Sequence, residues 1–202
     1  MYDLFVKESV LYTKSGTINA VHAGARVKKL LQLVSGGVYD EDGNVQYLHQ
    51  ERYDIVMQLV STRAHSIVAF NWKHERDALI ALAEKQNITY DLIDGSVPAH
   101  KRKDIVERFQ AGQIQVLFCH PQSASHGLTL TKATTCIWCS PTYNAEHFQQ
   151  FNKRIHRAGQ KLKTETILIA AHKTWEEDVY TKLDTKLGKM ENLLHILTEL
   201  NN

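Results

Sequence analysis

Short apolar runs alternate with amphipathic segments through the middle of the chain. The apolar runs have the length of buried strands and occupy residues 66–70, 89–93, 115–119, 134–139 and 165–171. The segments between them carry apolar residues at helical spacing and occupy residues 74–86, 98–112 and 145–157. This alternation predicts an α/β fold, in which a parallel sheet is covered by helices on both faces.

The two ends of the chain have a different pattern. Residues 25–34 and 49–61 are predicted helices, and residues 38–48 are a predicted hairpin that turns at Asp42-Gly43. A long helix is predicted from Trp175 to Leu200, with an apolar stripe at Val179, Leu183, Leu187, Met190, Leu194 and Leu197. We therefore divide the chain into an N-terminal helix and hairpin extension (1–61), an α/β lobe (62–172) and a C-terminal amphipathic helix (173–202). The stripe favours packing of this helix on the lobe over recruitment of a partner.

The overall composition is that of an ordinary globular chain with a sizeable core. The 202 residues are 43% hydrophobic and 23% charged, and the formal net charge is +2. A charge this small does not indicate nucleic-acid binding by itself, so any basic surface must be local. The first residues lack the apolar segment of a secretory signal, and no apolar run is long enough to cross a bilayer. We expect a cytoplasmic protein with no membrane partner.

The three cysteines and 11 histidines give little indication of metal or redox chemistry. Cys136 and Cys139 have the spacing of a redox or zinc motif, but they lie in an apolar run that predicts a buried strand. A hydrolase built on Cys119 and His120 is disfavoured because neighbours on a strand point to opposite faces. The sequence therefore predicts core cysteines and no metal site.

Two arginines, Arg154 and Arg157, stand three residues apart near the end of the helix predicted at 145–157. Side chains at this spacing are neighbours on a helix, so both guanidinium groups could reach one anionic target. Gly159 follows as a predicted C-terminal cap. The target could be a carboxylate, a nucleic-acid backbone or the phosphates of a nucleotide, and a pair of solvated arginines is the simpler alternative.

Several segments in a defined order resemble motifs of a known family. They read IVAFNW, IDGSVPAHKRKDIVERFQAG, SASHGLTLTKATTCIWCSPTYN, QQFNKRIHRAGQ and TWEEDVYTKL. From Ile67 to about Tyr180 the chain thereby resembles the second RecA-like lobe of a Swi/Snf-type helicase of superfamily two. The N-terminal segment LLQLVSGGVYDEDG is similar to one in phage-encoded members, which would place the protein in the cytoplasm of a bacterial host.

The resemblance implies a nucleotide site that two lobes share. Arg157 matches the arginine finger of motif VI, Arg154 its phosphate-facing companion, and Gln150 and Gly127 further nucleotide-binding positions. The chain has no Gly-x-x-x-x-Gly-Lys-Ser/Thr loop to hold phosphates and no Asp-Glu-x-His box to hold magnesium. We therefore expect ATP and Mg²⁺ to be bound mainly by an N-terminal RecA-like lobe of the same parent protein. The chain alone should be inactive as an ATPase.

The resemblance also implies a track for duplex DNA along the phosphate backbone, with no need to read base edges. The positions that match DNA contacts in the family are Asn71, Trp72, Ser96, Arg102, Lys103, Ser123 and Ser125. Lys101 and Lys103 have a solubilising surface as their alternative, and Trp72 has packing near a strand end.

We interpret the chain as the second motor lobe of an ATP-dependent DNA helicase or translocase. One alternative keeps the fold without the motor, as a nucleic-acid-binding or adaptor domain that has no ATPase partner lobe. Another alternative is the corresponding lobe of an RNA helicase. The Gly-Gln pair after Arg157 favours the Swi/Snf-type branch over this alternative.

Overall fold

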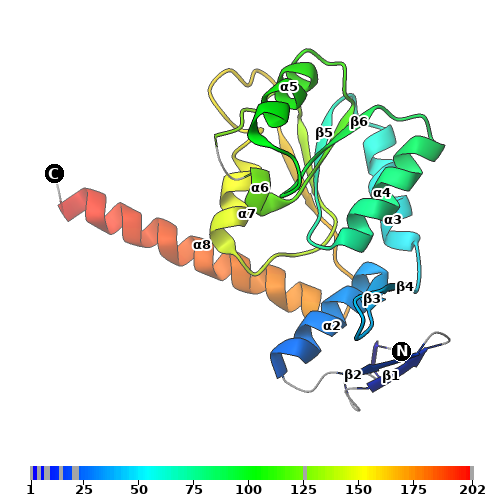
Figure 1. Ribbon diagram of the computed structural model, residues 1–202. Helices are drawn as coiled ribbons and strands as arrows, with labels where there is room; N and C mark the ends of the chain where they lie inside the picture. The colour runs from blue at the N-terminus through cyan, green and yellow to red at the C-terminus, as the bar shows by residue number, and fades with distance from the viewer. Residues whose placement is uncertain are drawn as a thin grey trace.

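A five-stranded parallel sheet forms the centre of the molecule (Figure 1). The structure is a computed structural model that describes residues 2, 3, 6, 10–13, 16–19, 23–124 and 127–200. The strand order is β6-β7-β5-β8-β9, with bounds β5 (Ser66–Ala69), β6 (Tyr90–Ile93), β7 (Val116–Cys119), β8 (Thr135–Trp138) and β9 (Glu165–Leu168). In the centre of the sheet, Ile67 lies opposite both Leu117 and Cys136. The five parallel strands confirm the predicted α/β fold.

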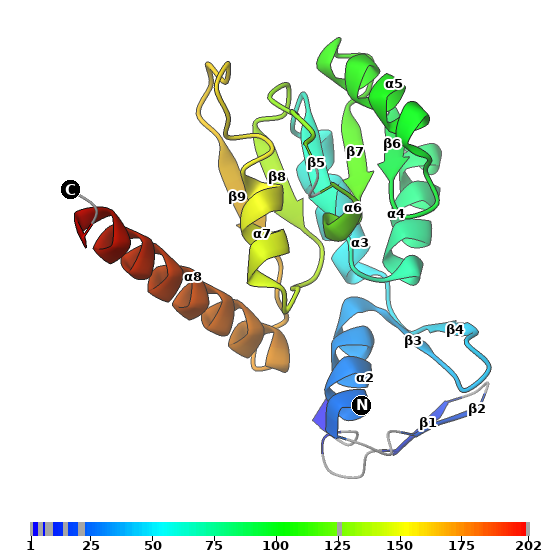
Figure 2. The same cartoon turned by 60° about the vertical axis from the view of Figure 1, so that its left-hand side comes forward.

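Helices cover both faces of this sheet, as Figure 2 shows from a second direction. One face carries α3 (Glu51–Ser61) and α4 (Lys73–Lys85), and the other carries α5 (Ala99–Gln110), α6 (Pro121–Ala124) and α7 (Ala145–Asn152). Strand residues alternate between two cores: Ile67 packs toward α5 and α7, whereas Val68 packs toward α3 and α4. Because α3 lies on the sheet, the packed lobe includes this helix from the N-terminal region.

The N-terminal region consists of β1 (Val10–Thr13), β2 (Gly16–Asn19), α2 (Ala23–Ser35), β3 (Gly37–Tyr39) and β4 (Val45–Tyr47). Strands β3 and β4 form the hairpin predicted at 38–48. Gly43 turns it with φ +84°, and the Asp40 carboxylate accepts a hydrogen bond from the Asn44 backbone at 2.8 Å. Gly36 links α2 to β3 at φ +108°, where a Cβ atom would lie 2.7 Å from the His49 carbonyl oxygen. Glycine at this position is therefore required by both backbone conformation and space.

The long helix α8 (Trp175–Leu200) begins beside α2 at the carboxyl edge of the sheet and then runs outward (Figures 1 and 2). Val179 and Leu183 are buried in the core, and Leu187 packs against it. The other members of the predicted stripe, Met190, Leu194 and Leu197, lie outside the side chains that the structure describes. No helix in the described part of the chain combines the length and apolar character needed to cross a membrane.

The cysteines are core residues on different faces of the sheet. Cys119 and Cys136 are buried with α5 and α7, whereas Cys139 is buried with α3 and α4. Burial raises the pKa of the Cys139 thiol well above its usual range. The burial of Cys136 and Cys139 in separate cores confirms the prediction that this pair fills the interior.

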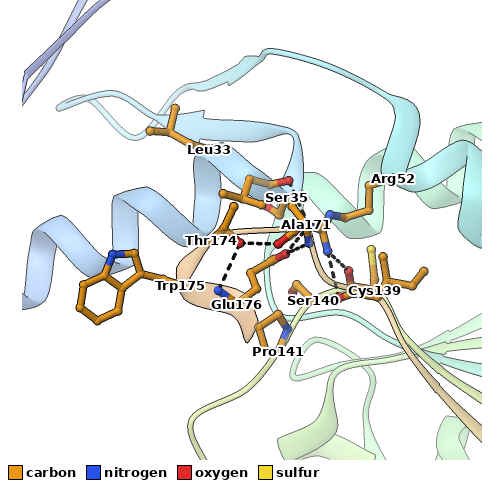
Figure 3. A network of polar contacts seen from close by, with 12 residues as sticks. Leu33, Ser35, Arg52, Cys139, Ser140, Pro141, Ala171, Thr174, Trp175 and Glu176 are labelled. Carbon is orange, nitrogen blue, oxygen red and sulfur yellow. Dashed lines mark hydrogen bonds and ion pairs between the residues drawn. The ribbon is translucent and has the colours of Figure 1, made fainter. Parts of the chain in front are cut away.

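A buried ion pair joins the N-terminal region, the sheet and α8 (Figure 3). Arg52 of α3 donates to the Glu176 carboxylate at 2.6 Å, and both side chains are almost fully buried. Arg52 also donates to the carbonyls of Cys139 at 2.6 Å and Val34 at 3.1 Å. Glu176 accepts a further hydrogen bond from the backbone of Ala171 at 2.9 Å. These contacts hold α2, α3 and α8 against the ends of β8 and β9.

Candidate nucleotide and nucleic-acid site

Arg154 and Arg157 converge on the loop that precedes β8. Each donates from Nη1 to the carbonyl oxygen of Leu128, at 3.3 Å from Arg154 and 3.2 Å from Arg157. Arg157 also donates to the Thr129 hydroxyl at 3.2 Å. Two positive charges therefore lie together where the segment around residues 127–130 meets the segment around residues 150–160.

The two arginines do not share a helical face, which corrects the helix predicted at 145–157. Helix α7 ends at Asn152, and Gly159, at φ +97°, lies beyond it and is not its cap. The chain leaves the helix because the Arg154 carbonyl accepts from the Leu130 backbone at 3.0 Å and Ile155 enters the core. The amide of Gln160 then holds this turn by donating to the carbonyls of Thr131, Ala133 and Ile155. Long-range contacts, and not helix geometry, place the guanidinium groups side by side.

The two guanidinium groups differ in their exposure. Arg154 is 5% exposed, and burial together with the charge of Arg157 lowers its pKa from the ordinary value. Arg157 is exposed to solvent. A guanidinium stays protonated in proteins and binds phosphate oxygens through two parallel N–H groups. The exposed arginine is thus the one that can meet a ligand directly, and the buried one stabilises the turn that carries it.

The other two predicted nucleotide-binding residues lie nearby with different surroundings. Gly127 adopts φ +68° immediately before Leu128, and the space around its Cα is open. The amide of Gln150 donates to the Glu146 carboxylate at 2.8 Å, one turn earlier on α7. The structure therefore brings Gly127 to the arginines, whereas Gln150 makes its described contact within its own helix.

Ser96, Arg102 and Ser123 form one cluster at the carboxyl ends of β6 and β7. The guanidinium of Arg102 donates to the carbonyls of Val97 at 2.7 Å, Asp94 at 3.1 Å and Ser123 at 3.3 Å. The Ser96 hydroxyl donates to the Asp94 carboxylate at 2.5 Å. Burial acts to raise the pKa of Asp94, but hydrogen bonds from Ser96 and Arg76 outweigh burial and lower it. Arg102, on α5, therefore braces the loop that carries Ser96 and joins it to Ser123 in α6.

Asn71 and Trp72 lie after β5 in a separate part of the carboxyl edge. The amide of Asn71 donates to the carbonyls of Ser140 at 2.9 Å and Pro141 at 3.2 Å, which joins the loops after β5 and β8. Trp72 is partly buried against the core, and the Lys28 ammonium lies 5.9 Å from the centre of its ring. In the described structure both residues have packing partners, in line with the alternative raised for Trp72.

The loop from Asn71 to Trp72 is also tied to α4 by a buried carboxylate. Glu75 Oε2 accepts hydrogen bonds from the backbones of Asn71 at 2.8 Å and Trp72 at 3.1 Å. Burial raises the pKa of Glu75 to about 7, and these hydrogen bonds offset the effect of burial only in part. The side chain of the adjacent His74 is buried as well, and burial lowers its pKa to about 4.

The remaining candidate DNA contacts include two exposed lysines of α5. Lys103 is highly exposed on α5, with its ammonium 3.9 Å from the Glu107 carboxylate. Lys101 is exposed two positions earlier on the same helix. Ser125 lies outside the described residues. Both lysines are exposed to solvent, and an exposed cation is sufficient for a contact with the phosphate backbone.

Leu128 and Gln160 are the parts of the site that sequence reasoning missed. Leu128 contributes only its carbonyl oxygen, which no side-chain pattern reveals. Gln160 stands in the Gly-Gln pair that ends the arginine motif. The sequence therefore pointed to this residue, but it did not reveal the three carbonyls to which the Gln160 amide donates. Within the described residues, no group of three or more His, Cys, Asp or Glu side chains could hold a metal ion.

The sheet order, the crossover helices and the paired arginines define a RecA-like lobe of the kind found in helicases. Residues 51–159, more than half of the chain, match the family described as "Helicase conserved C-terminal domain". The chain belongs to this family, as the C-terminal lobe of a Swi/Snf-type helicase of superfamily two. The match begins at α3, the helix that packs on the sheet.

Relatives of the chain include phage and animal proteins. A protein named p41 from Acyrthosiphon pisum secondary endosymbiont phage 1 is 26% identical over 97% of this chain and 42% of its own length. Chromodomain-helicase-DNA-binding protein 1-like from Mus musculus is 27% identical over 66% of this chain and 15% of its own length. The crystal structure of the C-terminal part of the Fun30 ATPase domain shares the fold, with a TM-score of 0.60 and 18% identity over 64% of this chain and 44% of that one. The chain thus spans less than half of the length of these curated relatives.

Proposed function

We propose that the chain is the second motor lobe of an ATP-dependent DNA helicase or translocase. The observation that carries the proposal is the convergence of Arg154 and Arg157 on the carbonyl of Leu128. Membership of the helicase family and similarity to the mouse chromodomain-helicase support it. Since the chain spans only part of these relatives, the complete motor is assigned to a parent protein.

In this proposal Arg157 is the arginine finger. Phosphoryl transfer is catalysed mainly by positioning and by stabilising the charge that develops on the transferred group. Among the described residues, the hydrogen bonds of Arg157 involve Nη1 alone, so its exposed guanidinium retains donors for phosphate oxygens. Closure of a nucleotide-bearing lobe against this surface would bring those donors to the γ-phosphate.

Arg154 acts as the companion of Arg157. It is buried and bonds the same carbonyl, so it holds the turn in place and adds positive charge behind the finger. Gly127 would let the loop backbone approach the nucleotide closely, since its Cα faces open space. Gln150 would join the nucleotide site only after exchanging its present contact with Glu146.

ATP and Mg²⁺ are assigned mainly to the first lobe of the parent protein. Guanidinium groups suit the phosphates of ATP, so the site fits that part of the nucleotide. The described residues offer no cluster of carboxylates for magnesium. When bound, the metal ion would neutralise charge on the β- and γ-phosphates, and this chain would supply the arginines.

The DNA track is placed at the carboxyl edge of the sheet. Arg102 braces the loop that carries Ser96, and the exposed Lys103 adds positive charge beside it. Asn71 and Trp72 continue the track toward α2, and Ser123 in α6 marks its other end. Ser125 is retained as a contact on the sequence alone. Binding through phosphates would be salt-sensitive and largely independent of sequence. The similarity to a phage protein supports a bacterial host cytoplasm as the location.

The test is ATP hydrolysis by the isolated chain and by the parent protein, each with and without duplex DNA. We expect no DNA-stimulated hydrolysis from the isolated chain and clear stimulation in the parent protein. Turnover that copurifies with the isolated chain would overturn the assignment of a half motor. A parent that binds DNA but hydrolyses no ATP would favour the adaptor alternative, and stronger stimulation by duplex RNA would favour an RNA helicase.

A further inference from the structure

A cavity of about 640 Å³ opens at the carboxyl edge of the sheet, between α2 and the start of α8. The loops after β5 and β8 form its other walls. We call it the α2–α8 cavity, and its aromatic and charged lining residues are Lys28, Trp72, Tyr143, Trp175, Asp178 and Lys182. Its volume is in the range typical of small-molecule sites, which is roughly 300–1,000 Å³. Of these six residues Lys28 alone lies outside the segments that resemble helicase motifs, and Trp72 alone is among the DNA contacts expected from the sequence.

Aromatic rings with accessible faces line this cavity. Tyr143 is 49% exposed and Trp175 is 38% exposed, so neither ring is needed to fill the core. The side chain of Trp175 points away from the buried ion pair that fixes the start of α8 (Figure 3). Trp72 lies deeper and packs against the core. Two large exposed rings beside a cavity are suited to stack against a planar ligand.

The charged residues that line the cavity suit an anionic ligand with a planar ring. The Lys28 ammonium lies 5.9 Å from the ring centre of Trp72, and the Lys182 ammonium lies 5.9 Å from that of Trp175. Asp178 is the single acidic residue among the described lining residues. Lysines beside aromatic rings are the arrangement with which proteins hold single-stranded nucleic acid, because bases stack and phosphates pair with the cations.

We propose that the α2–α8 cavity binds an unpaired nucleobase of DNA. The base stacks on Tyr143 and Trp175, Lys28 and Lys182 meet the flanking phosphates, and Asp178 accepts from an exocyclic amino group. The proposal rests on the proposed function and deepens it, since Asn71 and Trp72 of the DNA track also line the cavity. The lobe would then bind preferentially where a duplex meets a single strand.

The experiment compares three labelled DNA ligands by fluorescence anisotropy with the intact chain. One is a blunt duplex of about twenty base pairs. The second carries in addition a tail of about twelve deoxycytidines, whose bases have an exocyclic amino group, and this length is within the range of known single-strand sites. The third has the same tail without bases, so its charge is equal. We expect the base-bearing tail to strengthen binding about five- to a hundredfold over the baseless tail, which is the range for stacking of one base. Its advantage over the blunt duplex should be at least as large, because the duplex also lacks the tail phosphates.

Variants then locate the effect on the cavity. Tyr143→Ala and Trp175→Ala should reduce the affinity for the base-bearing tail to that for the baseless tail, while Tyr143→Phe should keep it. Tyr47→Ala is the matched control, because Tyr47 is 53% exposed and lines a different cavity. The affinity for blunt duplex should be the same in all four variants.

Three outcomes would overturn the proposal. Equal affinity for the two tails, with duplex binding intact, would be consistent with the DNA track. It would show that the cavity does not bind a base and would favour a protein segment as its ligand. If the unaltered chain binds none of the three ligands, both the DNA track and the base-binding cavity are refuted. Equal losses from Tyr143→Ala and Tyr47→Ala would show that the tail binds elsewhere.

Discussion

Removal of Glu176 should destabilise the lobe more than the loss of any exposed ion pair. Glu176 accepts from Arg52 at 2.6 Å, and the two side chains are 0% and 5% exposed. Loss of one partner from a buried pair leaves an uncompensated charge and costs roughly 3–5 kcal/mol. Glu176→Ala also removes the acceptor of the Ala171 backbone, so we expect a value in the upper half of this range.

Arg52→Ala should have a comparable effect for a different reason. It leaves the Glu176 carboxylate buried with the Ala171 backbone as its remaining described donor, and it leaves the carbonyls of Cys139 and Val34 without the guanidinium. The double variant Arg52→Met/Glu176→Leu removes both charges and fills the space. It should therefore cost much less than the sum of the two single variants.

The assay is urea unfolding followed by circular dichroism, with the free energy of unfolding taken from the midpoint and slope. The pair between Arg63 and Glu165 is the matched control: its distance is 2.9 Å, but its side chains are 20% and 52% exposed. Glu165→Ala should cost less than about 1 kcal/mol. If Glu176→Ala and Glu165→Ala cost the same, the buried pair does not hold α8 to the lobe as we infer.

Three further predictions concern protonation, backbone conformation and DNA. The raised pKa of Glu75, about 7 against 4.5, makes the folded state bind the extra proton, so stability from this group is lost as pH rises from 4.5 to 7. Glu75→Gln, measured against the parent by urea unfolding at each pH, should become more stabilising across that window by up to about 3 kcal/mol; a difference independent of pH would refute this. The comparison with the parent cancels His74, whose lowered pKa gives stability that is lost as pH falls from 6.5 to 4. Gly36→Ala should lower the free energy of unfolding by about 3 kcal/mol in the same assay. Gly43→Ala, where φ is positive but the surrounding space is open, should lower it by about 1 kcal/mol. Equal losses would show that the atoms around Gly36 move to accommodate the added methyl group. Lys103→Gln should lower the salt slope of duplex binding by about one, and an unchanged slope would remove this lysine from the DNA track.

The central strands β5, β7 and β8 could be predicted from the sequence because they are buried on both faces of the sheet. Residues such as Ile67 and Val68 must both be apolar when each face carries a core, so these strands appear as continuous apolar runs. The edge strand β9 is largely exposed, yet Ile167 still packs against the core and marks it. Element type therefore followed from local composition in this part of the chain.

The end of α7 could not be predicted because distant residues decide it. Nothing in the local sequence opposes a helix through Arg157, and no proline or glycine intervenes before Gly159. The helix stops because Arg154 and Ile155 find partners in the loop of residues 128–133. A contact between residues more than twenty positions apart outweighs the local helix preference. The spacing of apolar residues along the sequence does not reveal such a contact.

The candidate site was predictable in its residue positions and not in its hydrogen bonds. The motif order located the segments that bear Ser96, Arg102 and Ser123, and the structure does bring these residues together. That Arg102 binds three backbone carbonyls depends on loop geometry, which the residue types do not reveal. The pairing of Arg52 with Glu176, 124 positions apart, was likewise invisible in the sequence.

The most direct measurement for the proposed motor role is steady-state ATP hydrolysis beside equilibrium ATP binding, with Arg157 altered in the parent protein. Arg157→Ala should reduce DNA-stimulated hydrolysis by on the order of a thousandfold or more, while the ATP affinity stays within roughly tenfold of the parent. Arg157→Lys should rescue little, since an ammonium cannot reproduce the planar fork. Arg108→Ala, which removes an exposed arginine paired with Asp91 and Asp104, should hydrolyse ATP at the parent rate. A folded Arg157→Ala enzyme that hydrolyses ATP at nearly the parent rate would contradict the assignment of the finger.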